Sequence, residues 1–105
     1  MKHIFVHHVF FWLKEPNNPE ARQKLEAGLQ TLGKIGEIQE MHIGVPANTD
    51  RSVVDNSYSH SLLIILRDKA DHDIYQNHPI HLKFIEDCSH LWTKVLVLDS
   101  VDAIK

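Results

Sequence analysis

Residues 3–14 form a long run of apolar and aromatic side chains that favours a β-strand, and this run constrains the fold most. Odd positions carry Phe5 and Phe11, and even positions carry Phe10 and Trp12, so both faces of the strand are largely apolar. A strand of this kind is buried on both sides. A chain of 105 residues can cover one face with helices but has too few elements to cover the other. We therefore expect a partner subunit on the second face.

The rest of the sequence alternates between strand and helix patterns. Asn18 followed by Pro19 is a typical helix start, Gly33 and Gly36 bracket its end, and His78-Pro79 interrupts a later helical stretch. Strands are predicted over residues 3–14, 38–45, 57–67 and 91–101, and helices from 19, over 68–77 and over 80–90. The polar segment 46–56 has the composition of a loop.

This β-α-β-β-α-β order predicts an α+β fold of ferredoxin-like type, a four-stranded antiparallel sheet with helices on one face. We expect one such domain over residues 1–105. The open face would expose Leu63 and Ile65 together with one apolar set from the first and last strands. An apolar patch of that size is unusual on a monomer, so we predict a homodimer that packs through this open sheet face.

Charge and composition exclude several classes of function. The net charge of −3 disfavours nucleic acid as a partner, because phosphate binding needs clustered Lys and Arg. No apolar run is long enough for a membrane span, and the N-terminal residues lack a signal-peptide pattern, so we expect a cytoplasmic protein. Cys88 lies in an apolar helical stretch, which predicts a buried structural thiol.

The chain has nine His residues, and their positions differ in what they predict. Four of them lie near strand starts, on polar faces or beside charges, and we expect these to be solvated: His3, His42, His72 and His90. His8 would lie on the open sheet face, at the dimer interface.

Three segments of the sequence resemble the stress-responsive A/B-barrel domain (Dabb) family. Residues 7–14, His-His-Val-Phe-Phe-Trp-Leu-Lys, are similar to the opening strand, in which a His begins an apolar run that closes on Lys. Residues 75–81, Tyr-Gln-Asn-His-Pro-Ile-His, are similar to the helix signature His-Pro-x-His with a Tyr three residues earlier. Residues 91–99, Leu-Trp-Thr-Lys-Val-Leu-Val-Leu-Asp, are similar to the closing strand.

The resemblance implies a dimeric α/β barrel, in a family where many members have no assigned activity. One plant branch is a polyketide cyclase, with a Tyr and a His from the helix signature and His residues from the first and third strands. The matching positions here are Tyr75, His81, His7 and His60. The chain departs from the family in the longer lead before His7, in Trp12 and in the long polar loop, so the cyclase's substrate does not transfer.

We predict that Tyr75 and His81 are the catalytic residues, because imidazole titrates near neutral pH and a phenol can donate a hydrogen bond to a carbonyl oxygen. His7, His60 and His78 are predicted to contact a small apolar or carbonyl-containing ligand. The alternative for His7 and His60 is a pair of satisfied core residues, close together on adjacent strands. The alternative for His78 is a hydrogen bond in the helix kink.

Two other classes of function stay open. The protein could be a non-catalytic stress-responsive structural protein, or several converging His side chains could bind a metal or haem. No recognisable motif such as His-Glu-x-x-His accompanies them, so we expect neither a metal nor another cofactor.

Overall fold

The computed structural model describes residues 3–104, and its elements follow the predicted order. The strands are β1 (Phe5–Leu13), β2 (Glu40–Gly44), β3 (His60–Leu66) and β4 (Trp92–Val101), and the helices are α1 (Pro19–Thr31), α2 (Lys69–Asn77) and α3 (Pro79–Cys88). Short 3-10 turns follow α1 at Leu32–Lys34 and α3 at Ser89–Leu91. Within residues 3–104, every helix is too short or too polar to cross a bilayer.

Side-chain caps fix where the helices begin. The Asn18 Oδ1 accepts a hydrogen bond of 3.0 Å from the Glu20 N–H at the start of α1. Asp68 caps α2 in the same way, 2.9 Å from the Asp71 N–H. At His78 the backbone turns extended, so α2 ends and α3 begins at Pro79, as the His-Pro pair predicts.

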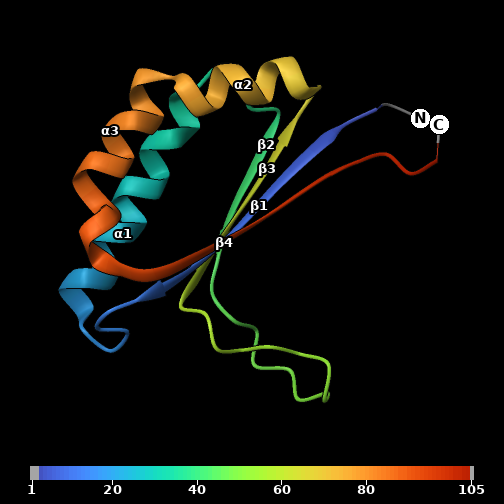
Figure 1. Cartoon of the computed structure of the whole chain (residues 1–105). Helices are drawn as coiled ribbons and strands as arrows, with labels where there is room; N and C mark the ends of the chain where they lie inside the picture. The colour runs from blue at the N-terminus through green and yellow to red at the C-terminus, as the bar shows by residue number, and fades with distance from the viewer. Residues whose placement is uncertain (1–2, 105) are drawn as a thin grey trace.

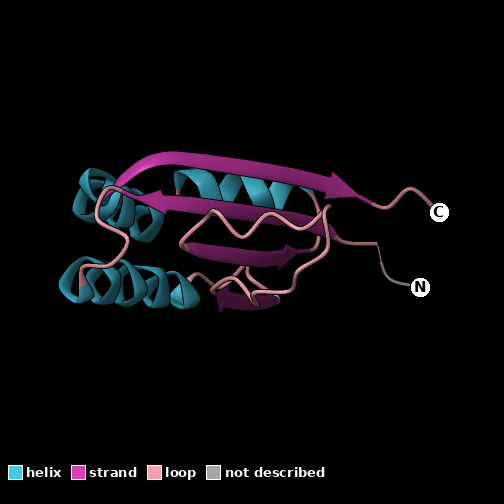
Figure 2. Cartoon of the chain, turned by 90° about the horizontal axis from the view of Figure 1, so that it is seen from below, coloured by secondary structure: helices cyan, strands magenta, loops and turns pink. Residues whose placement is uncertain are grey.

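The four strands form one antiparallel sheet in the order β2-β3-β1-β4. Figure 1 shows the three helices on one side of this sheet, and Figure 2 shows the strands of the sheet side by side. The predicted ferredoxin-like arrangement is confirmed, with β1 and β3 as the two central strands.

The hydrophobic core lies between the sheet and the helices. Odd residues of β1 are buried there and even residues are half-buried on the opposite face, in strict alternation. α1 and α3 pack closely over the core, where a Cβ atom on Gly28 would lie 2.6 Å from the Cys88 Sγ. Cys88 is buried, as predicted, and burial raises the pKa of its thiol.

The face of the sheet away from the helices is open in the single chain. Its apolar side chains form cross-strand rows, in which Leu63 and Leu98 flank His8 and Leu96 flanks Phe10. Leu98 is 54% exposed, and β4 is exposed along nearly its whole length. This is the apolar face that the sequence predicts.

Candidate functional site

A cavity of about 160 Å³ lies between the helix-covered face of the sheet and helices α2 and α3. Most of its lining is apolar, with Phe11, Phe84 and Trp92 as the aromatic walls. Ile85 on α3 and Val95 on β4 also line it and are exposed, so the cavity opens between these two elements. Its polar lining side chains are those of His7, Tyr75, Gln76 and His81. An apolar pocket with a few converging polar groups is the usual form of a small-molecule site.

His7 is the polar residue on the sheet floor of this cavity. It is a register partner of Asp99 on β4, and its Nδ1 lies 2.6 Å from the Asp99 Oδ1. A carboxylate only accepts hydrogen bonds, so the His7 Nδ1 carries the proton and Nε2 has the lone pair. Burial lowers the pKa of His7, and the bond to Asp99 opposes this only in part, so the ring is neutral at neutral pH.

Tyr75 comes from the last turn of α2 and lies between two imidazoles. Its ring centroid is 5.4 Å from that of His7 and 4.7 Å from that of His81. The side chain is 1% exposed, and burial raises the pKa of its phenol well above the usual range. Tyr75 therefore keeps its proton and can donate a hydrogen bond to an oxygen in the cavity.

His81 reaches the same cavity from the first turn of α3. Its Nδ1 lies 3.1 Å from the backbone carbonyl oxygen of Gln76, which only accepts, so Nδ1–H donates and Nε2 has the lone pair. The helix break at His78-Pro79 lies between these two residues. Burial lowers the pKa of His81, which keeps the ring neutral.

His72 belongs to this cluster, and the prediction that it is solvated was wrong. Its ring stacks on Phe5 at 4.5 Å and lies 5.1 Å from the His7 ring. The Nε2 of His72 is 3.6 Å from the Asp99 Oδ2, and neither of its buried ring nitrogens has a hydrogen-bond partner among the described residues. A sequence signal existed, since His72 precedes Tyr75 by three residues and therefore shares its helix face.

His60 does not join the cavity, so the expectation that it lies close to His7 was wrong. In the β1–β3 register, His60 pairs with Phe11 and His7 pairs with Ile64, which separates them by roughly 13 Å along the strands. The Nε2 of His60 instead lies 2.7 Å from the Glu26 Oε2 on α1.

His78 also lies outside the cavity lining. Its Nδ1 accepts a hydrogen bond of 3.1 Å from the Ile80 N–H, and it caps α3. This hydrogen bond in the helix kink is the alternative role that the sequence left open for His78. His3, His42 and His90 are exposed, as expected. His8 lies half-buried on the open sheet face, and its place at a dimer interface stays a prediction.

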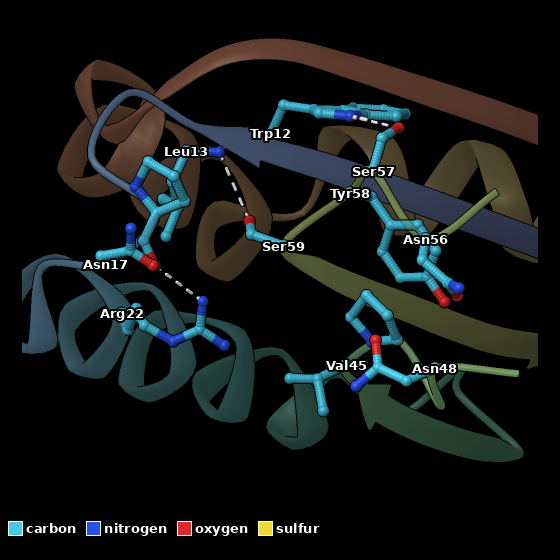
Figure 3. Close-up of a pocket in the computed structure, with 12 residues that line it drawn as sticks. Trp12, Leu13, Asn17, Arg22, Val45, Asn48, Asn56, Ser57, Tyr58 and Ser59 are labelled. Carbon is cyan, nitrogen blue, oxygen red and sulfur yellow. Dashed lines mark hydrogen bonds between the residues drawn. The ribbon is translucent and has the colours of Figure 1, made fainter.

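A larger pocket of about 530 Å³ lies at the end of the sheet, between the 46–58 loop and the start of α1 (Figure 3). It contains no His, and several of its polar groups already bond to neighbours. The Trp12 Nε1 donates to the Ser57 Oγ at 3.1 Å, and the Arg22 Nη1 donates to the Pro16 carbonyl at 2.9 Å. The pocket offers polar recognition but no acid–base pair, so the smaller cavity is the better candidate for chemistry.

The sequence matches the family model of the Stress responsive A/B Barrel Domain, Dabb, over residues 5–102. This chain belongs to the Dabb family. A comparison with curated proteins gives no significant match. The described cluster of Tyr75, His81 and His7 therefore lies within the Dabb domain itself.

Solved structures similar to this Dabb chain share its fold. A Dabb protein with a ferredoxin-like fold from Mesorhizobium loti is 20% identical, with a TM-score of 0.79, over 96% of this chain and 98% of that one. A dimeric ferredoxin-like protein of unknown function from Thermobifida fusca is 16% identical, with a TM-score of 0.77, over 97% and 93%. A hydroxynitrile lyase from Passiflora edulis is 23% identical, with a TM-score of 0.77, over 97% and 95%.

Proposed function

We propose that this Dabb protein is an enzyme that binds a small carbonyl compound and catalyses proton transfer beside the carbonyl group. The observation that carries the proposal is the convergence of a protonated Tyr75 and a neutral His81 in one apolar cavity, 4.7 Å apart between ring centroids. In this proposal His81 would be the base and Tyr75 the hydrogen-bond donor that the reaction requires.

In the proposed reaction, the His81 Nε2 removes a proton from the carbon next to the carbonyl. The electron pair of that C–H bond moves into an enolate, whose oxygen accepts a hydrogen bond from the Tyr75 hydroxyl. The enolate carbon can then be reprotonated by the His81 imidazolium, or it can attack a second carbonyl carbon, whose oxygen takes that proton, which gives an aldol product. The Gln76 carbonyl stabilises the imidazolium that forms, because the His81 Nδ1–H already donates to it.

The cavity limits the size of the ligand. Its volume of about 160 Å³ is below the ~300–1,000 Å³ of pockets for drug-sized molecules, so a small compound or one end of a larger one fits. Phe84 and Trp92 would pack against the carbon skeleton, and His7 would contact its polar end. A haem is too large for this space. The hydroxynitrile lyase from Passiflora edulis has the same fold, which supports an enzymatic role for a pocket on this fold.

The test is solvent exchange at the carbon next to the carbonyl. Small ketones and aldehydes are incubated with the protein in D₂O, and loss of the proton signal at that carbon is followed by NMR. We expect enzyme-dependent exchange for at least one compound that fits the cavity, and a loss of exchange in Tyr75→Phe and His81→Asn. Exchange at the buffer rate for every compound, or unchanged rates in both variants, would contradict the proposal.

The proposed enzyme is a homodimer that forms through the open face of the sheet. The exposure of Leu96 and Leu98 supports this, because so large an apolar strip is unusual on a monomer. The dimeric relative from Thermobifida fusca has the same fold. We expect light scattering to give the mass of a dimer at micromolar concentration and Leu98→Lys to give a monomer. A wild-type monomer would contradict this assembly.

A further inference from the structure

We infer that His7, His72 and Asp99 bind one divalent transition-metal ion beside the cavity. The three residues come from three different elements, β1, α2 and β4. Each offers one ligand atom, and these atoms all lie within 4.8 Å of one another. His72 and Asp99 have no part in the proposed proton transfer, so the site goes beyond that function.

The spacing of the ligand atoms suits a metal ion. At a metal–ligand distance of ~2.1 Å, two ligands of a tetrahedral site lie about 3.4 Å apart. The His7 Nδ1 is 2.6 Å from the Asp99 Oδ1, and the His72 Nε2 is 3.6 Å from the Asp99 Oδ2. These two distances lie on either side of that value, and all three ligand atoms lie within 4.8 Å of one another.

His72 provides an independent reason to expect a ligand here. Its Nε2, the atom that would ligate the ion, is buried and has no hydrogen-bond partner in the described part of the chain, whereas its Nδ1 lies 3.6 Å from the Asp73 Oδ1. Buried polar atoms are normally satisfied, and an unpaired one calls for a bound ion or water. The ring cannot easily turn away, because it stacks on Phe5 at 4.5 Å. Its position is therefore set before any ion binds.

The ligand set indicates which ions would bind. Two imidazoles and one carboxylate suit Zn²⁺ and neighbouring transition metals, whereas Mg²⁺ and Ca²⁺ prefer oxygen ligands. The side chain of Asp99 is 38% exposed, so an ion has a route from solvent and room for a water molecule as a further ligand. Three protein ligands and one open position are typical of catalytic rather than structural zinc sites.

Metal binding would change what His7 offers to the cavity, and this part of the inference rests on the proposed function. When Nδ1 ligates an ion, the proton of the neutral ring moves to Nε2. His7 would then be a hydrogen-bond donor to the ligand rather than an acceptor. Two donors, His7 and Tyr75, would face a carbonyl oxygen, while His81 would stay the base.

The test is a titration of chelator-treated protein with Co²⁺, followed by its visible absorption, and with Zn²⁺ by calorimetry. We expect one ion per chain, and at least a tenfold loss of affinity in Asp99→Asn and in His72→Phe, which keeps the stack on Phe5. The matched control is Asp102→Asn, because Asp102 pairs with the exposed His3 at 2.7 Å; its affinity should not change. Thermal melts identify any variant that has lost its fold.

Two results would overturn the inference. One is the absence of stoichiometric binding in the wild-type protein. The other is binding that is equally strong in folded Asp99→Asn or folded His72→Phe, since it would come from surface histidines. No substrate is present in the titration, so failure of the proposed enzyme activity cannot produce either result. Conversely, exchange of ketone protons by the metal-free protein would support the activity even without an ion.

Discussion

His7 and His60 both lie buried on the helix-covered face of the sheet, and each ring bonds to one carboxylate. The distances are nearly equal, 2.6 Å from the His7 Nδ1 to Asp99 and 2.7 Å from the His60 Nε2 to Glu26. Their surroundings differ. His7 lines a cavity with Tyr75 and His81, whereas the cavity at His60, under α1, has no second acid–base pair.

A buried His–carboxylate pair therefore does not make a candidate acid–base site by itself. His7 bonds to its carboxylate through Nδ1, and His60 bonds to its carboxylate through Nε2. Among the described residues, the nitrogen without a hydrogen bond is therefore Nε2 in His7 and Nδ1 in His60. The Nδ1 of His60 is buried and has no hydrogen-bond partner among the residues that the structure describes, and its ring is fully shielded from solvent. Within residues 3–104, only the region under α2 and α3 combines a free Nε2 with a phenol and a second imidazole.

The largest expected effect is a difference in exchange rate between variants in the cavity at His7 and a variant at the His60–Glu26 pair. Tyr75→Phe and His81→Asn should each lower the rate of ketone exchange by about 10²–10⁴-fold, because each removes one group that acts on the proton or on the oxygen. Glu26→Gln, at the His60 pair, should leave the rate within about twofold. The NMR exchange assay measures all three variants. An equal loss of exchange rate in Glu26→Gln would show that the two regions do not differ in their effect on activity.

The second effect is on the helix packing that lies between the two regions. Gly28→Ala should lower the free energy of unfolding by about 1–3 kcal/mol, because the new Cβ would overlap the Cys88 Sγ. Cys88→Ala in the same chain should recover part of this loss, since it removes the overlapping atom. Urea unfolding measures both variants. If Gly28→Ala is as stable as the wild-type protein, α1 and α3 do not pack as closely as the contact between Gly28 and Cys88 indicates.

The third effect is on the pH profile of exchange. The proposed catalysis needs neutral His81, so the rate should be highest above its pKa and fall about tenfold per pH unit below it. Burial lowers this pKa from its ordinary 6.5, so the acid limb should have its midpoint below 6.5. The profile should be the same in Glu26→Gln. A midpoint above 6.5 would mean that the base is not the buried His81.

The smallest effect concerns stability at the His60 pair. Glu26 is 46% exposed, so its bond to His60 is partly open to solvent and contributes little. Glu26→Gln should therefore change the free energy of unfolding by less than about 1 kcal/mol, because the amide oxygen still accepts from His60. Chemical denaturation measures the change. A loss of several kcal/mol would show that this pair stabilises the fold instead of merely satisfying one nitrogen.

Much of the fold could be predicted because its signals are local. Asn18, Asp68 and Pro79 define helix starts through contacts within a few residues, and the alternation in β1 defines its buried face. Strand ends were less accurate. The third strand was predicted from residue 57 but begins at His60, since the Asp55 side chain accepts from the Ser57 N–H and keeps that segment in the loop.

The candidate site could be predicted only where its residues share one segment. Tyr75 and His81 lie in one short signature, and the structure brings them together with His7. The pairing of His7 with Asp99 spans 92 positions and depends on the β1–β4 register, which no local pattern encodes. The separation of His60 from His7 depends on the β1–β3 register for the same reason.

The most direct test of the account is a long-range ¹H–¹⁵N NMR spectrum of the histidine rings at neutral pH. The account predicts that His7 and His81 are neutral with the proton on Nδ1, that His60 donates from Nε2, and that a small ketone shifts the Nε2 signal of His81 but no signal of His60. A proton on Nε2 of metal-free His81, or a ketone that shifts His60 alone, would contradict it.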